Sequence, residues 1–220
     1  MKQISILLAL WAGLALPVLA APAAAPAAVA APARQPAFAE VLAGPELLGR
    51  LRQGGFVLYL RHGSTDNTRP DRVPLLDFND CASQRPLTEQ GRKMVQRVGE
   101  AMRAARVALA EVLTSPLCRA KESAAAAFPD FAYAIDNNLA YTANLTDVQK
   151  APIIANTRRL LSAPVAAGRN RMLVAHGPNL MDLIGYFPAE GTLVVFRPGS
   201  GAGFEYVASI PPGLWPDLLR

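Results

Sequence analysis

Two runs of apolar residues that do not alternate with polar ones constrain the fold most. "FVLYL" covers residues 56–60 and "MLVA" covers residues 172–175. A strand without polar alternation is buried on both faces, which is typical of parallel sheets that helices cover on both sides. Amphipathic patterns of helical length separate such runs along the chain. Alternating strands and helices predict an α/β domain with a mostly parallel sheet.

The remaining elements follow from periodicity and capping signals. We expect helices over 44–55, 87–107, 116–128, 146–162 and 178–187, and further strands over 110–115, 131–135, 192–198 and 204–210. Thr88 is a suitable N-cap for the second helix, and Pro116 is expected in the first turn of the third. Pro152 leaves the start of the fourth helix open. Residues 62–87, rich in Asp, Asn, Pro and Arg, form a long loop of the kind found at active sites.

The N-terminal part of the chain has the pattern of an export signal. A charged start is followed by an apolar run that ends in small residues, which predicts a signal peptide over 1–20. A retained membrane anchor is the alternative, but the run is short for a span and Pro17 interrupts it. Residues 21–37 are Ala/Pro-rich and predict an extended linker. The folded domain is then 38–220, in a periplasmic or secreted protein without a stable membrane span after cleavage.

The only two histidines of the chain stand in the same local context. His62 and His176 each end an apolar run and each precede a glycine. Between them "TSPLCRA" leaves a strand and enters a helix, and it carries Arg119. In open α/β sheets, ligands bind beyond the carboxyl ends of the strands. We therefore expect Arg61, His62, Arg119 and His176 to converge in one crevice.

Two imidazoles and two guanidiniums describe a pocket for a phosphate dianion. Arginine offers a planar fork to phosphate oxygens, and a helix N-terminus adds free N–H donors. A neutral imidazole held at one ring nitrogen can attack phosphorus with the other. The arginines would stabilise the transferring phosphoryl group, so the mechanism needs no metal and no other cofactor.

Several other interpretations remain for these residues. Each histidine taken alone is more often structural, the arginines could be surface ion-pair partners, and the glycines could serve ordinary turns. Zinc is disfavoured because the sequence has neither an H-x-x-x-H nor a C-x-x-C spacing. The formal net charge of +5 suits an anionic ligand, but no basic run is interleaved with aromatic residues, which argues against nucleic acid.

Three ordered motifs together resemble the histidine phosphatase superfamily, the phosphoglycerate-mutase-like proteins of branch 1, and in particular an exported subset. "LYLRHGST" is similar to its Arg-His-Gly signature, "TSPLCRAKESA" to its Ser-Pro-x-x-Arg-Ala segment, and "LVAHGPN" to its second-histidine segment. The resemblance covers about residues 56–210. It implies a three-layer α/β/α sandwich around a mostly parallel central sheet.

The resemblance also implies roles for individual residues. His62 would be the nucleophile that forms a phosphohistidine, which water then hydrolyses. Arg61, Arg119 and His176 would bind the phosphoryl oxygens, with His176 counted among the catalytic residues. Gly63 and Thr65, in the first motif, are expected at the substrate-binding site.

One departure from the family pattern concerns the proton donor. Many members carry a glutamate shortly after a leucine that corresponds to Leu139, whereas Ala140 and Tyr141 follow it here. We expect Asp147 to be the donor, although it could simply occupy the first turn of a helix, where negative charge is favourable. Other candidates for the donor are Asp66, Asp80 and Glu190.

The two cysteines fall next to the expected site. "DFNDCASQRPLT" is similar to a loop of the exported subset, in which a cysteine follows acidic residues. A bond between Cys81 and Cys118 would fix the first loop against Arg119. Two buried free thiols are the alternative.

These observations predict an exported, metal-independent phosphatase that hydrolyses a small phosphomonoester, with a cell-envelope sugar phosphate as the expected substrate. A phosphomutase is the alternative enzyme, but its cytosolic substrates conflict with export. A phosphate-sugar binding module without turnover is the alternative outside enzymes, motivated by the missing glutamate.

Overall fold

The structure is a computed structural model that describes residues 37–199, 201 and 203–220. Residues Ala37–Arg220 form one compact unit. The predicted signal peptide and all but the last residue of the predicted linker lie outside the described residues. In the described part of the chain, no helix is long and apolar enough to cross a membrane.

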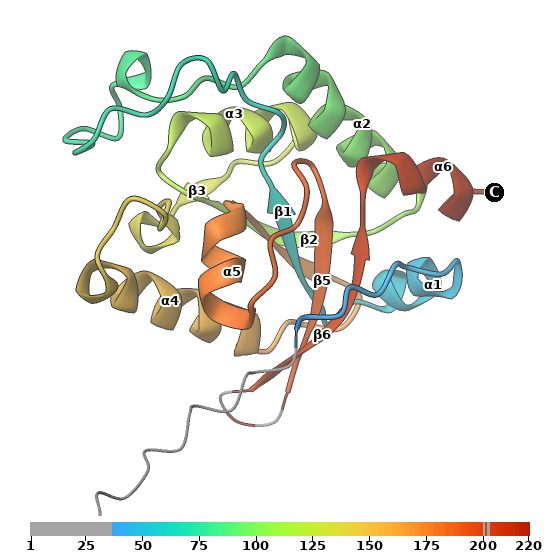
Figure 1. The fold of residues 1–220 in the computed structure, drawn as a ribbon. Coiled ribbons are helices and arrows are strands. Elements are labelled where there is room, and N and C mark those ends of the chain that lie inside the picture. Colours follow the sequence, from blue (N-terminus) through green and yellow to red (C-terminus); the bar gives the residue numbers. More distant parts are fainter. Residues whose placement is uncertain (1–36, 200, 202) are drawn as a thin grey trace, which may run out of the picture. The chain divides into compact units, whose positions relative to one another are not determined.

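A six-stranded sheet forms the centre of this unit (Figure 1). Its strand order is β3-β2-β4-β1-β5-β6. The first four strands in this order run parallel, whereas β5 is antiparallel to both β1 and β6. The strands are β1 (Val57–Arg61), β2 (Leu109–Thr114), β3 (Ala134–Ile135), β4 (Asn170–Ala175), β5 (Leu193–Pro198) and β6 (Phe204–Ile210). The prediction of a mostly parallel sheet is confirmed, and β5 is the one strand of this sheet that runs against the other five.

Helices cover both faces of the sheet, which confirms the three-layer sandwich. The helices are α1 (Glu46–Gln53), α2 (Glu89–Ala104), α3 (Cys118–Ala127), α4 (Asp147–Ser162), α5 (Gly177–Ile184) and α6 (Trp215–Leu218). One apolar core joins α1, α2, α3 and α6 to the sheet, and a second joins α4 and α5 to its other face. Successive residues of β1 alternate between the two cores, so Leu58 and Tyr59 face opposite layers. This explains why the sequence of the strand shows no polar alternation.

Helix boundaries agree closely with the capping signals. Thr88 accepts a hydrogen bond from the Gly91 backbone N–H at the start of α2, as predicted. Thr146 and Gln149 form a capping box that starts α4, and Pro152 lies inside this helix without ending it. Pro116 precedes the N-cap residue of α3 and therefore lies outside the first turn in which it was expected.

Candidate active site

Three parallel strands deliver the predicted site residues to one edge of the sheet. In β1, β4 and β2, Arg61 pairs with Ala175 and Val174 pairs with Thr114. The next residues along the chain are His62, Ser115 and His176. The strand ends therefore converge as the sequence predicted.

His62 is held in one tautomer by its own loop. Its side chain is buried, and ring atom Nδ1 lies 2.8 Å from the Gly63 carbonyl oxygen. A carbonyl only accepts, so Nδ1 carries the proton and the lone pair is on Nε2. Burial and the nearby Arg119 charge lower the pKa of His62 well below its ordinary value. The ring is therefore neutral and its Nε2 is free to act as a nucleophile.

His176 is fixed by its backbone and by its ring. The Tyr59 hydroxyl donates to the His176 carbonyl oxygen at 2.8 Å and accepts from the His176 backbone N–H at 3.0 Å. Ring atom Nε2 lies 2.7 Å from the Ser115 hydroxyl. The ring centroids of His62 and His176 are 5.2 Å apart. Burial, followed by the Arg119 charge, also lowers the pKa of His176 well below its ordinary value.

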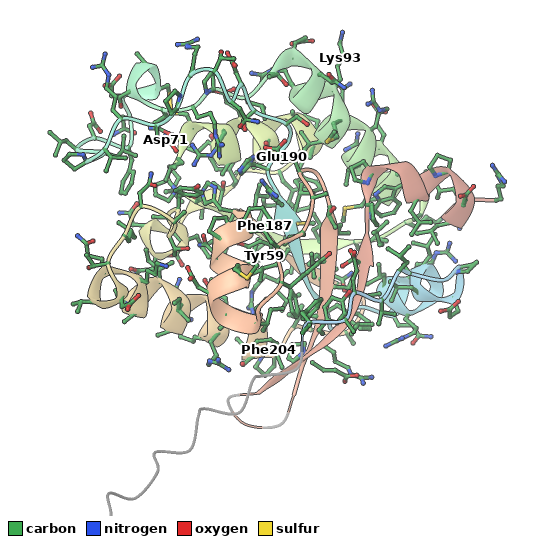
Figure 2. The ribbon with its side chains drawn as sticks, viewed as in Figure 1. Tyr59, Asp71, Lys93, Phe187, Glu190 and Phe204 are labelled. Atoms are coloured by element: carbon green, nitrogen blue, oxygen red, sulfur yellow. A yellow bond between two sulfur atoms is a disulfide. The ribbon has the colours of Figure 1, made fainter. Side chains whose placement is uncertain are left out.

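The connection between α5 and β5 holds Arg61. Its Nη1 donates to the Pro188 carbonyl oxygen at 2.5 Å, and its Nη2 lies 3.7 Å from a carboxylate oxygen of Glu190. The guanidinium stands over the Phe187 ring at 4.6 Å from the centroid. Figure 2 labels Glu190 and Phe187 in this connection. Arg61 therefore has a fixed orientation before any ligand binds.

Arg119 is fully buried and forms a two-pronged ion pair with Asp71. The two distances, from Nη1 to Oδ1 and from Nη2 to Oδ2, are 2.8 and 3.2 Å. Its guanidinium also lies over the Tyr141 ring, 4.9 Å from the centroid. Asp71 belongs to the long loop between β1 and α2, where Figure 2 labels it. This carboxylate orients the arginine while leaving its Nε–H unused.

A third arginine, Arg85, was missed in the sequence analysis. Its backbone N–H donates to Asp71 Oδ1 at 2.8 Å, and its Nη1 donates to Asn67 at 3.0 Å. Its charge lowers the pKa of both His62 and His176, so it lies within electrostatic range of both rings. The sequence feature that could have identified Arg85 is its position in "QRPLT", at the end of the long loop that leads back to the site.

Four buried nitrogen atoms around His62 have no hydrogen-bond partner within the described part of the chain. They are Nε of Arg61, Arg85 and Arg119, and Nδ1 of His176. Buried polar groups are normally satisfied, so each such group requires an explanation. Four unsatisfied nitrogens, three of them on guanidiniums, fit an oxyanion that binds in their midst.

Gly63 has a structural task in this arrangement. Its backbone N–H donates to the Ser123 hydroxyl at 3.1 Å, so it is already satisfied. A Cβ atom at Gly63 would overlap the Gly91 carbonyl, and one at Gly91 would overlap the Ser64 backbone. The contact lets the N-terminus of α2 pack directly on the loop of His62. The structure thus shows a packing role for Gly63, and its contact with substrate stays a prediction.

The other predicted polar residues lie at different distances from the centre. The Thr65 hydroxyl donates to Glu190 at 3.0 Å, which links it to the carboxylate beside Arg61. Asp147 is exposed in the first turn of α4, and no described contact joins it to either histidine. Asp66 accepts from Thr68 in a local turn, so it too has no described link to the ring of His62.

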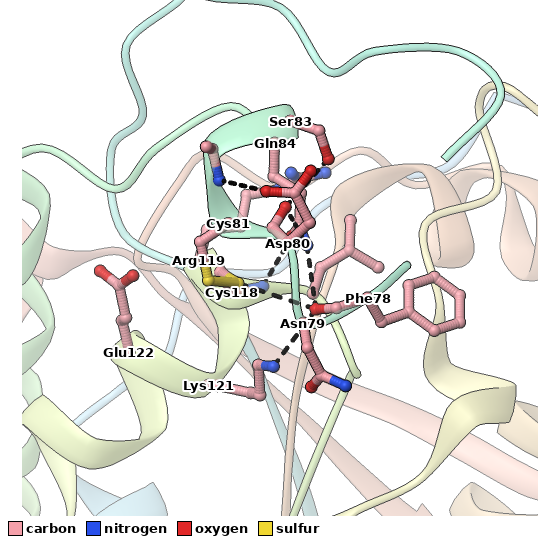
Figure 3. Close-up of a disulfide and its surroundings, with 12 residues drawn as sticks. Phe78, Asn79, Asp80, Cys81, Ser83, Gln84, Cys118, Arg119, Lys121 and Glu122 are labelled. Carbon is pink, nitrogen blue, oxygen red and sulfur yellow. Dashed lines mark hydrogen bonds between the residues drawn. A yellow bond between two sulfur atoms is a disulfide. The ribbon is translucent and has the colours of Figure 1, made fainter. Parts of the chain in front are cut away.

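A disulfide joins Cys81 and Cys118, as predicted (Figure 3). Cys81 lies in a short 3-10 turn of the long loop that Asp80 caps through the Ala82 N–H, so Asp80 is engaged there. Cys118 starts α3, directly before Arg119. The Gln84 side chain also accepts from the Cys118 backbone N–H at 2.8 Å. The loop that carries Asp71 and Arg85 is thereby fastened to the helix that carries Arg119.

The comparisons with known proteins agree with this geometry. Residues 57–140 match the model of the histidine phosphatase superfamily (branch 1). The match includes Arg61, His62 and Arg119. Over these residues the chain matches the superfamily that its motifs resemble. No curated protein matches the chain.

Solved structures show the same fold at low sequence identity. The protein histidine phosphatase SixA in complex with tungstate aligns with a TM-score of 0.50 and 16% identity, over 72% of this chain and 97% of that one. Mycobacterial glucosyl-3-phosphoglycerate phosphatase with inorganic phosphate aligns with a TM-score of 0.52 and 18% identity, over 72% and 98%. The phosphoglycerate-mutase-like sandwich is therefore confirmed.

Proposed function

We propose that this protein is a phosphatase that hydrolyses a small phosphomonoester through a phosphohistidine at His62. The observation that carries the proposal is the ring of buried, unpartnered nitrogens around a neutral histidine. Three guanidiniums and the two histidines match the charge and the hydrogen-bonding needs of a phosphoryl group. The family match and the phosphatase folds that resemble this one support the same chemistry.

The reaction follows from the tautomer of His62. The Nε2 lone pair attacks phosphorus, and the bond from phosphorus to the ester oxygen breaks as the new N–P bond forms. The leaving oxygen takes a proton and departs as the alcohol. Water then attacks the phosphohistidine, which releases inorganic phosphate and restores neutral His62. The hydrogen bond from Nδ1 to Gly63 holds the ring in place through both steps.

Cleavage of the ester also requires a group that donates a proton to the leaving oxygen. Glu190 is the carboxylate beside Arg61, and Thr65 donates a hydrogen bond to it. Both oxygens of Asp71 are occupied by Arg119, at 2.8 and 3.2 Å, whereas Glu190 meets Arg61 only through the longer 3.7 Å contact. Glu190 therefore replaces Asp147 as our candidate donor.

A hydrolysis assay tests the enzyme proposal. The folded part, residues 38–220, would be assayed with p-nitrophenyl phosphate in the presence of EDTA, beside His62→Ala. We expect turnover that survives EDTA and disappears in the variant, whose fold is checked by circular dichroism. Binding of inorganic phosphate without turnover in the unaltered protein would favour the binding module instead. Net transfer of phosphate to a second alcohol, without its release, would favour a mutase.

We also propose that the protein is exported, and that its substrate is a phosphate of the cell envelope. The pattern of residues 1–20 and the disulfide support this, because disulfides persist in oxidising compartments. Cell fractionation after expression of the full chain in a Gram-negative host tests it. We expect the full chain in the periplasmic fraction and a chain that begins at Phe38 in the cytoplasm. Recovery of the full chain in the cytoplasm would contradict the proposal.

A further inference from the structure

A pocket of about 350 Å³ lies beside the proposed phosphate site. Asp71 and Tyr141 belong to its lining, and both also contact Arg119. The Tyr141 ring further meets the His176 ring edge-on, with centroids 5.4 Å apart. The pocket therefore adjoins the proposed phosphate site through Asp71 and Tyr141, and its volume is within the range of small-molecule sites.

The floor of this pocket is apolar. Leu117, Ala140 and Ile153 are buried and form a small core of their own, against which Leu145 and Phe78 pack. All five line the pocket. A group bound on this floor would remove apolar surface from water, so at least one face of the ligand must be apolar.

The rim of the pocket carries carboxamides. Asn137, Asn138 and Asn144 are exposed, line the pocket, and have side chains for which the structure shows no hydrogen-bond partner. A carboxamide both donates and accepts, which suits hydroxyl groups on a ligand. The lining contains no lysine, and its only charged side chains are Asp71 and the exposed Arg72. A second anionic group on the ligand would have little to neutralise it here.

We infer that this pocket binds the alcohol part of the substrate and selects a neutral, polyhydroxylated group with an apolar face, as a sugar ring has. This inference rests on the proposed phosphatase function and specifies its substrate class. The expectation of a sugar phosphate from the sequence came from the predicted compartment alone. The pocket supports it independently and adds that the sugar carries no second charged group.

Steady-state kinetics with a set of phosphomonoesters test the inference. Glucose 6-phosphate, 3-phosphoglycerate, fructose 1,6-bisphosphate and p-nitrophenyl phosphate would be compared by kcat/KM. We expect glucose 6-phosphate to exceed the two substrates with a second anionic group by about tenfold or more, because the only cation in the lining is the solvent-exposed Arg72, next to the carboxylate of Asp71. Equal or better turnover of the doubly anionic substrates would overturn the inference.

Variants of the rim separate the pocket from the phosphate site. We expect Asn138→Ala combined with Asn144→Ala to lower kcat/KM for glucose 6-phosphate roughly tenfold, the order of magnitude for two lost hydrogen bonds. Turnover of p-nitrophenyl phosphate, which has no hydroxyls for the amides, should stay the same. Asn79→Ala is the matched control, since Asn79 is an exposed asparagine of the loop between β1 and α2 and does not line the pocket.

These experiments separate a failure of the pocket inference from a failure of the proposed phosphatase function. If p-nitrophenyl phosphate is hydrolysed but the paired variant leaves glucose 6-phosphate unaffected, the inference about the pocket is wrong and the proposed function stands. If no phosphomonoester is hydrolysed and inorganic phosphate does not bind, the proposed function fails and the inference fails with it.

Discussion

Asp71 shows how a single loop residue completes the site. Its two oxygens occupy one side of the Arg119 guanidinium, and Oδ1 also accepts the Arg85 backbone N–H. The remaining N–H groups of Arg119, including the unpartnered Nε–H, are left for a ligand. Asp71 thus positions the Arg119 side chain through an ion pair. It also holds the loop of Arg85 by accepting the backbone N–H of that residue.

Asp71→Asn should destabilise the protein and make it more dependent on phosphate. Breaking a buried ion pair leaves an unbalanced charge, so we expect a loss of about 3 kcal/mol in the free energy of unfolding. A bound phosphate dianion would supply the missing countercharge. Thermal unfolding with and without inorganic phosphate should therefore show a larger rise in Tm for the variant than for the wild type.

Asp130→Asn, a change at an exposed aspartate in the turn after α3, is the control and should alter neither quantity. A wild-type unfolding free energy for Asp71→Asn would show that the pair with Arg119 does not contribute to stability.

The buried histidines predict how stability depends on pH. Burial lowers the pKa of His62 and His176 in the folded protein, whereas in the unfolded chain both titrate near the ordinary value of about 6.5. Below that pH the unfolded chain binds more protons, so the free energy of unfolding falls as the pH is lowered from 7.5 to 5. His62→Gln should reduce this slope by roughly one proton, about 1.4 kcal/mol per pH unit. Denaturant titrations across this pH range would measure it, and an unchanged slope would contradict a neutral, buried His62.

At the scale of elements, the contact between α2 and the loop of His62 depends on two glycines. Gly63 and Gly91 meet so closely that neither has room for a Cβ atom. The helix N-terminus therefore rests on the backbone that follows His62. Any added volume at this contact must move either the helix or the loop.

Gly91→Ala should accordingly reduce both stability and activity. Overpacking typically costs 1–3 kcal/mol, and we expect about 2 kcal/mol here because the overlap is with backbone atoms. Gly49→Ala is the matched control, since Gly49 lies in α1 with no atom within 4 Å of the added methyl group. That control should gain up to about 1 kcal/mol from helix propensity. Equilibrium unfolding and p-nitrophenyl phosphate turnover of both variants would test the difference.

The regular elements were predictable because their patterns are local. The uninterrupted apolar run of β1 and the Thr88 cap of α2 gave correct elements. The strand expected over 131–135 is reduced to Ala134 and Ile135, both exposed at the edge of the sheet. Only two of its residues pair with β2, and no sequence pattern records which residues an edge strand will pair.

The site was predictable where it follows regular strands and unpredictable where it depends on the long loop. Arg61, His62 and His176 end strands, so their convergence follows from the topology of a parallel sheet. Asp71 and Arg85 lie in residues 62–87, which have no periodicity from which their fold could be read. Their positions are set by tertiary contacts, chiefly the ion pair with Arg119.

At the scale of the whole molecule, the disulfide connects the long loop between β1 and α2 to the regular fold. It links residues 37 positions apart and joins the loop of Asp71 to the start of α3. A cross-link over this length stabilises by restricting the unfolded chain, typically by 2–4 kcal/mol. Its placement means that the loop and Arg119 are fixed together.

Removal of this bond should therefore weaken substrate binding as well as stability. We expect Cys81→Ser with Cys118→Ser to lose about 3 kcal/mol of unfolding free energy and to show a raised KM for p-nitrophenyl phosphate. A reductant should reproduce both effects in the wild type and have no effect on the double variant. Unchanged KM after full reduction would show that the loop keeps its position without the bond.

The α5–β5 connection has a consequence for how quickly the site can accept a ligand. Pro188, Glu190 and Phe187 hold the side chain of Arg61, and the Gly191 N–H contacts the carbonyl oxygens of Arg61 and His62. A long side chain normally loses considerable rotamer entropy when it binds an anion. For Arg61 this rotamer entropy is already lost on folding, so an anion would bind to a guanidinium with a fixed orientation. Association should then proceed as a simple encounter, without a slow adjustment step that would limit turnover.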